Sequence, residues 1–167
     1  MRNVAVTVEP ATHADIKEII ASANALVTTD AGRYDPDATN LDWAARTGSA
    51  YCGALLESDD NLVLLARDGG AVVGHLVGRL SGPGSVHPIR VAELESIHVY
   101  EAHRGGGVGD RLVTAFFAWA AGKGAQRASV TAYVKNEGAQ RFYARHGFVA
   151  KSVVLDRDDL PPASDHG

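Results

Sequence analysis

The sequence predicts an α/β fold with one domain, in which helices cover both faces of a mixed β-sheet. Its 167 residues are typical of a single domain, and 46% of them are hydrophobic, which is enough for a sizeable core. Strand-like and helix-like segments follow one another in the order β-α-α-β-β-β-α-β-α-β, which fits that layered arrangement. The clearest segments are a strand, a glycine-rich turn and an amphipathic helix in the middle of the chain.

The first third of the chain is expected to hold one strand and two helices. Residues 4–8 form the strand, and apolar residues at helical spacing predict a helix over 12–26. A loop over 28–40 leads to a second helix over 41–56, in which Tyr51 is expected to be buried.

Two strands over 62–67 and 71–80 form a predicted hairpin around a short Asp-Gly-Gly turn. Gly74 and Gly78 interrupt the second strand and indicate bulges or close backbone approach. The remaining predicted elements are the central strand 91–100, a helix from Val108, a strand over 128–134, a short helix after Asn136 and a last strand over 148–155.

Composition excludes several functional classes. A net charge of −4 does not suit a nucleic-acid partner, and the lone Cys52 rules out a disulfide framework. Neither a secretory core nor a membrane-spanning stretch is seen, so a cytoplasmic protein is predicted. The histidine spacing predicts no metal site. The domain is expected over 1–157, and the acidic, proline-bearing stretch 158–167 is predicted to be a disordered tail.

The turn over residues 104–109, RGGGVG, has the chemistry of an anion site. Backbone N–H groups at a helix start lack partners within the helix, and glycines let a phosphate come close to them. The dinucleotide fingerprint does not fit, because Asp110 stands where its third glycine is needed. The P-loop does not fit either, because no Lys-Ser or Lys-Thr pair follows the turn.

Two segments resemble the GCN5-related N-acetyltransferase (GNAT) superfamily. Arg104, Gly107 and Gly109 match its R/Q-x-x-G-x-G/A motif, and residues 136–148 resemble its N-x-x-A-x-x-F-Y-x-x-x-G-F segment. The resemblance extends over about 61–155. It implies a GNAT-like sheet of about six to seven strands and transfer of an acetyl group from acetyl-CoA to an amine.

The resemblance also implies which residues bind acetyl-CoA. The splayed central strand would pair with the pantetheine arm, the Val99 N–H would contact the thioester carbonyl, and Arg104 would lie at the diphosphate. The implied binding residues are Ile97, His98, Val99, Arg104, Gly105, Gly106, Gly107, Val108, Gly109, Asp110, Asn136 and Tyr143.

Transfer to an amine needs a base, because an alkylamine of pKa about 10.4 is protonated at neutral pH. Glu93 and Glu95 are the candidates, and they share a strand face unless a bulge intervenes. Both remain open as the base. Tyr143 is the candidate acid for the leaving thiolate, by resemblance to the tyrosine of the family segment.

The acceptor is predicted to be a primary amine of a small molecule or peptide. Asp30, Asp35 and Asp37 in the loop 28–40 would attract a cation, although aspartates also serve simply to turn loops. A homodimer formed through a sheet edge also fits the family. Two alternatives stay open: a degenerate acyl-CoA-binding sensor, and a nucleotide-binding module of another fold.

Overall fold

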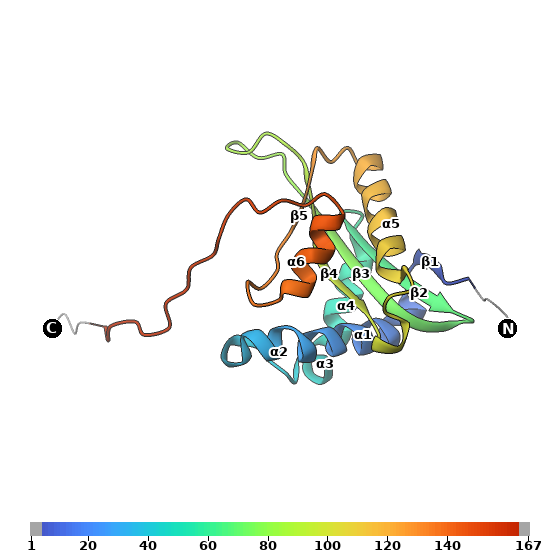
Figure 1. Cartoon of the computed structure of the whole chain (residues 1–167), viewed down its shortest axis with the longest axis horizontal. Helices are drawn as coiled ribbons and strands as arrows, with labels where there is room; N and C mark the ends of the chain where they lie inside the picture. The colour runs from blue at the N-terminus through green and yellow to red at the C-terminus, as the bar shows by residue number, and fades with distance from the viewer. Residues whose placement is uncertain (1–4, 164–167) are drawn as a thin grey trace.

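The computed structural model describes residues 5–163, which form a five-stranded sheet with helices on both faces (Figure 1). The strands are β1 (Thr7–Pro10), β2 (Asn61–Asp68), β3 (Ala71–Ser81), β4 (Val91–Val99) and β5 (Arg127–Val130). They lie side by side in chain order, antiparallel except for the parallel pair β4 and β5. The α-helices are α1 (Ile16–Thr29), α2 (Ala31–Tyr34), α3 (Trp43–Arg46), α4 (Gly48–Glu57), α5 (Val108–Gly122) and α6 (Glu137–Arg145). Short 3-10 turns span His13–Asp15, Pro36–Ala38 and Glu101–His103.

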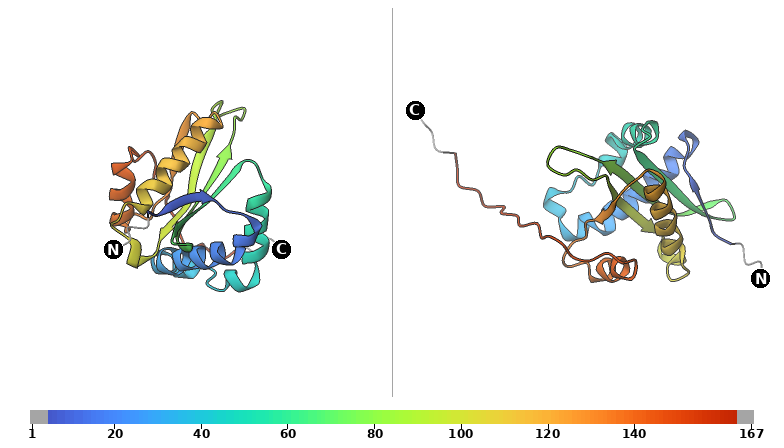
Figure 2. Two further views of the ribbon diagram at one scale, coloured as in Figure 1. Left: turned by 90° about the vertical axis from the view of Figure 1, so that its right-hand side faces the viewer. Right: turned by 90° about the horizontal axis from the view of Figure 1, so that it is seen from above.

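The sheet separates two hydrophobic cores. The left view of Figure 2 shows α5 on one side of the strands and α1 on the other. On one face, α5 packs Leu112 and Phe116 against apolar side chains of β2, β3 and β4. On the other face, Ile19 of α1 and Leu55 of α4 pack against β2 and β3. Strand residues alternate between the two cores, because successive side chains point to opposite faces. The prediction of a mixed sheet covered on both faces is therefore confirmed.

The N-terminal elements differ in detail from those predicted. The first strand begins at Thr7, and position 4 of the predicted strand lies outside the described residues. The predicted loop 28–40 contains α2 and a 3-10 turn, and the predicted helix 41–56 is divided into α3 and α4. At the division the Thr47 hydroxyl donates to the Trp43 carbonyl, 3.2 Å away, a local bond that competes with regular helix.

The prediction of a last strand over 148–155 is wrong. Residues 148–155 form neither strand nor helix, and Figure 1 shows the chain leaving the domain after α6. Val149 and Leu155 are each 89% exposed. A β-favouring sequence becomes a strand only when a neighbouring edge pairs with it, and no described segment pairs with the outer edge of β5. The described sheet therefore has five strands instead of six or seven.

Two irregularities shape the middle of the sheet. In the pairing of β3 with β4, Gly78 lies opposite Leu94 but Val77 lies opposite Ser96, so Glu95 is an extra, bulged residue. The prediction for Gly78 is confirmed, because a Cβ there would lie 3.0 Å from the Phe116 ring. Glycine at this position lets α5 pack directly on the strand.

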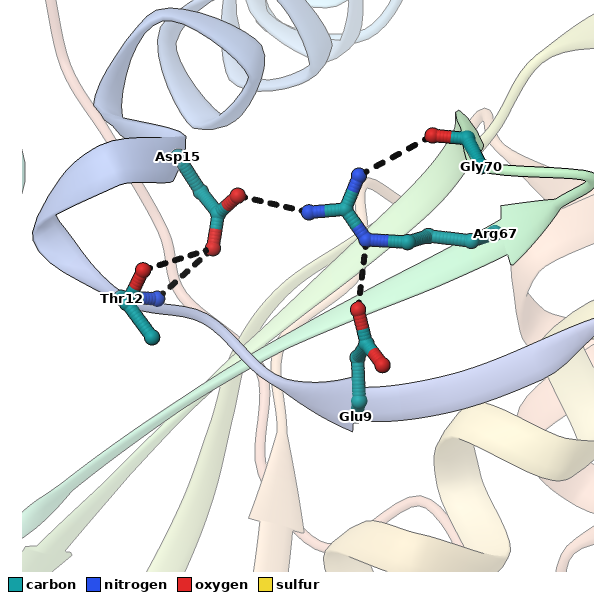
Figure 3. Close-up of polar contacts among 5 residues, drawn as sticks. All are labelled: Glu9, Thr12, Asp15, Arg67 and Gly70. Atoms are coloured by element: carbon teal, nitrogen blue, oxygen red, sulfur yellow. Dashed lines mark hydrogen bonds and ion pairs between the residues drawn. The ribbon is translucent and has the colours of Figure 1, made fainter.

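A charged cluster joins the N-terminal segment to the sheet (Figure 3). Arg67 of β2 donates to Glu9 and to Asp15, both at 2.6 Å, and to the Gly70 carbonyl at 3.2 Å. Thr12 donates its backbone N–H to Asp15 at 2.8 Å. This bond and Arg67 hold the pKa of Asp15 below its usual value against the effect of burial. The cluster fixes the entry of the chain into α1.

Candidate functional site

The glycine-rich turn has a backbone that only glycine adopts readily. Gly105 and Gly107 have φ angles of 78° and 81°, and Gly107 is the N-cap of α5. A Cβ at Gly109 would lie 3.1 Å from the Phe142 ring, so this glycine lets α6 approach the start of α5. The N-terminal N–H groups of α5 thus begin directly behind a turn of three glycines, of which Gly106 is the middle one.

The first turn of α5 is also tied to α6 by charge. Asp110 accepts a hydrogen bond from the His146 ring at 2.8 Å and lies 3.6 Å from Arg145. Val108 is buried in the core below the turn. These contacts place Gly109 and Asp110, two of the predicted binding residues, beside α6.

The C-terminal half of β4 has an unpaired edge. The ladder between β4 and β5 ends at Leu94 and Val130, and within the described chain no strand continues it. The Tyr100 N–H donates to the Val73 carbonyl of β3 at 2.9 Å, so by alternation the Val99 N–H faces the opposite, open side. Arg104 donates from Nε to the Val99 carbonyl at 2.8 Å. The glycine turn and the open strand edge are therefore neighbours.

Asn136 and Tyr143 of the α6 segment lie near Asp30, which follows α1. Asn136 accepts from the Ala139 N–H at 3.0 Å and caps α6, while its amide donates to Asp30 at 2.9 Å. Burial raises the pKa of Tyr143 to about 12, and the negative charge of Asp30 acts in the same direction. Asp30, which the sequence suggested as an attractant for a cationic substrate, is thus engaged with α6.

Glu95 is held in a polar cluster on the face that α1 and α4 cover. Its carboxylate accepts hydrogen bonds from the Arg79 guanidinium and from the Tyr51 hydroxyl, and Arg79 also lies 3.4 Å from that hydroxyl. Burial, together with the bond to Glu95, raises the pKa of Tyr51 to about 12. Glu93 is exposed and lies opposite Arg79 in the ladder.

Sequence reasoning missed two members of this cluster. Tyr51 was expected to be a buried packing residue of a long helix, but it is 39% exposed and reaches Glu95. Arg79 is an ordinary strand residue in the sequence, and no local signal identifies it. Beside Tyr51 lies a cavity of about 290 Å³ lined by Val27, Trp43 and Thr47 as well. The indole N–H of Trp43 is buried without a hydrogen-bond partner among the described residues.

The side chains of Ile97 and His98 lie on opposite faces of β4. Ile97 packs against the core beneath α5, whereas His98 is 6% exposed on the α1 side. Burial and the charge of Arg104 lower the pKa of His98 to about 4. Only the backbone of His98 is therefore available near the open edge, a restriction that the sequence did not reveal.

No group of three metal-ligating side chains occurs within residues 5–163. In the same range, every helix is too short or too polar to cross a bilayer. Cys52 is buried, and this burial raises the pKa of its thiol.

Comparison with known proteins agrees with this geometry. Residues 24–148 match the model of the acetyltransferase (GNAT) family. An uncharacterised N-acetyltransferase of Methanocaldococcus jannaschii is 29% identical over 104 residues, which are 62% of this chain and 46% of that protein. The chain thus matches less than half of that relative's length.

Solved structures share the fold at low sequence identity. A transcriptional regulator from Bacillus halodurans has a TM-score of 0.75 at 22% identity, with 93% of this chain and 100% of that chain covered. An aminoglycoside N-acetyltransferase solved with CoA has a TM-score of 0.74 at 17% identity, with coverage of 95% and 98%.

Proposed function

Because the chain belongs to the GNAT acetyltransferase family, we propose that it transfers the acetyl group of acetyl-CoA directly to a primary amine in a ternary complex. The observation that carries this proposal is the position of Glu95, which lies at a bulge of β4 just before the open strand edge. A base and a binding edge for the acetyl donor thus lie on one short segment.

The donor would bind along the open edge and the glycine turn. The N–H groups of residues 105–109 and the positive end of α5 suit a diphosphate, and Arg104 adds charge beside them. Within residues 5–163 no strand pairs with the edge of β4 beyond Leu94, so an extended pantetheine arm would pair with backbone groups there, with Arg104 on the Val99 carbonyl. The outward N–H of Val99 is suited to stabilise the negative charge that develops on the thioester oxygen.

The reaction would proceed by attack of the neutral amine on the thioester carbonyl. Glu95 would take a proton from the acceptor ammonium, directly or through water. The new C–N bond forms as the C–S bond breaks, and the thiolate takes a proton from Tyr143. The raised pKa of Tyr143 keeps its hydroxyl protonated for this step. The second proton of the former ammonium leaves the new amide nitrogen and returns through water to the Tyr143 phenolate.

The acceptor would enter from the α1 and α4 side, where Tyr51, whose hydroxyl donates to Glu95, lines the small cavity. Trp43 and Tyr51 present aromatic rings there, with centroids 5.9 Å apart. Aromatic faces attract ammonium groups, and the indole N–H offers a donor to a polar atom of the acceptor. A small-molecule or peptide amine fits this environment.

The test combines binding with turnover. Acetyl-CoA at 100 times its Kd should stabilise the protein by about 2.7 kcal/mol, whereas ATP and NAD should not. Release of the CoA thiol is then followed with a panel of amines. Glu95→Gln should lower kcat on the order of 100-fold or more with little change in the KM for acetyl-CoA, because base catalysis contributes that much. Glu93→Gln is the matched control and should stay near the parent rate.

Three outcomes would count against the proposal. Stabilisation by ATP or NAD in place of acetyl-CoA would favour a nucleotide-binding module. Stabilisation by acetyl-CoA without thiol release on any amine would favour the acyl-CoA sensor. Turnover that survives Glu95→Gln but not Glu93→Gln would move the base to Glu93.

A further inference from the structure

A chain of buried polar side chains runs from α1 through β3 to β4. Ser22 and His75 are both 0% exposed, and the Ser22 hydroxyl lies 2.6 Å from Nδ1 of His75. Nε2 of His75 lies 3.1 Å from the hydroxyl of Ser96. The Ser22 hydroxyl is also 3.3 Å from Nδ1 of His98, which lies opposite His75 in the sheet.

The hydrogen bonds of this chain can all be satisfied with both rings neutral. A serine hydroxyl donates one proton, so it donates to one histidine and accepts from the other. If Ser22 donates to His75, then His75 carries its proton on Nε2 and donates to Ser96, while His98 donates to Ser22. The reverse order is equally complete, with Ser96 donating to His75. Neutral rings agree with the pKa of His75, which burial and the neighbouring His98 lower to about 3.

The end of this chain is the residue next to the proposed base. Glu95 is the extra residue of the bulge, and Ser96 resumes the pairing with Val77. Both side chains contact partners on the face covered by α1 and α4: Glu95 reaches Tyr51 of α4, and Ser96 reaches His75. Two consecutive strand residues face one side of a sheet only where a bulge breaks the alternation.

We propose that His75 is a positioning residue for Glu95, and that it acts by holding Ser96 and thereby the β4 bulge. The bond between Nε2 of His75 and the Ser96 hydroxyl fixes the second residue of the bulge from inside the core. The direction of the Glu95 side chain then follows from the backbone. The kinetic part of this inference rests on the acetyltransferase function proposed above, but the structural part does not.

Two substitutions of one residue separate this role from simple packing. The amide of Gln at position 75 reaches the place of Nε2 and can keep the bond to Ser96. The shorter Asn reaches only the place of Nδ1 and can keep the bond to Ser22. We expect His75→Asn to lower kcat on the order of 10-fold with an unchanged KM for acetyl-CoA, because small misplacements of a catalytic group slow the chemistry. His75→Gln should retain most of the parent kcat.

Ser96→Ala removes the same bond from its other end. It should lower kcat as much as His75→Asn does, and the double variant should lose no more than either single one. Equal losses of kcat in the Asn and Gln variants would overturn the proposal, as would a parent-like kcat in Ser96→Ala. Thermal unfolding of each variant checks that the fold is retained.

A measurement without turnover keeps this inference distinct from the proposed function. The backbone N–H groups of Glu95 and Ser96 should exchange with solvent faster in His75→Asn than in the parent, because the bulge is held less firmly, and at the parent rate in His75→Gln. If the parent protein binds acetyl-CoA but acetylates no amine, the proposed function fails while these exchange rates still decide the positioning role. Parent-like exchange rates in both variants would overturn it.

Discussion

Mild acid should destabilise this protein through two buried histidines. The pKa values of His75 and His98 are lowered from 6.5 to about 3 and about 4. At a pH just below 6.5 both rings therefore stay neutral in the native state, whereas the same rings take up protons in the unfolded chain. The free energy of unfolding therefore falls as the pH drops below 6.5. Between pH 7 and pH 5 each ring lowers the free energy of unfolding by about 1.9 kcal/mol, since one pKa unit corresponds to about 1.4 kcal/mol. The sum, about 4 kcal/mol, is a large part of the 5–15 kcal/mol typical of a domain.

Urea unfolding at pH 7, 6 and 5 measures this loss. Asp15 does not contribute between pH 7 and pH 5. Its pKa is lowered in the native state, so its stabilising effect is lost only as the pH falls through the usual value of 3.8 and below. His75→Gln should reduce the loss between pH 7 and 5 to about 2 kcal/mol, because one titrating ring is gone. His146→Gln is the control. This residue lies outside the buried pair of histidines and contacts Asp110 at 2.8 Å. Equal acid sensitivity in the parent and in His75→Gln would refute this explanation.

Three other substitutions test the packing of the site and its support. Gly109→Val should weaken acetyl-CoA binding at least 10-fold by calorimetry, because its Cβ would lie 3.1 Å from the Phe142 ring and force α6 away from the turn. Binding equal to the parent's would show that this close contact is not needed. Gly107→Ala should lower the free energy of unfolding in urea by about 1 kcal/mol, because alanine is strained at the φ of 81° that Gly107 has. An unchanged urea midpoint would argue against a positive φ at this position. Arg67→Ala should lower stability by about 1–3 kcal/mol and bring the pKa of Asp15 closer to 3.8 by NMR titration, since Arg67 is one of the groups that hold it down. An Asp15 titration unchanged from the parent would mean that the Thr12 bonds alone set its pKa.

The local parts of the fold could be predicted from the sequence. Helix α5 and the glycine turn are encoded by residues close together in the chain, and the close approach at Gly78 is marked by the glycine itself. Local pattern was not sufficient for residues 148–155, which were predicted to be a strand and are not one. These residues favour an extended backbone, but a strand also needs a partner edge that no local pattern specifies.

The polar clusters depend on contacts between distant segments. Tyr51 and Glu95 are 44 positions apart, and Ser22 and His75 are 53 apart. Nothing in the order of residues reveals that one histidine is fully buried beside a serine of another element. The bulge at Glu95 likewise appears only when the register of β3 against β4 is known.

The family motifs, the layered α/β class and the two acidic candidates for the base could all be identified from the order of residues alone. Only the folded chain shows that Arg79 and Tyr51 bind the carboxylate of Glu95. The physical reason is that hydrophobic periodicity and glycine act within one turn or one strand, and the sequence shows them directly. Ion pairs and buried hydrogen bonds join whichever side chains the packed sheet and helices bring within about 3 Å.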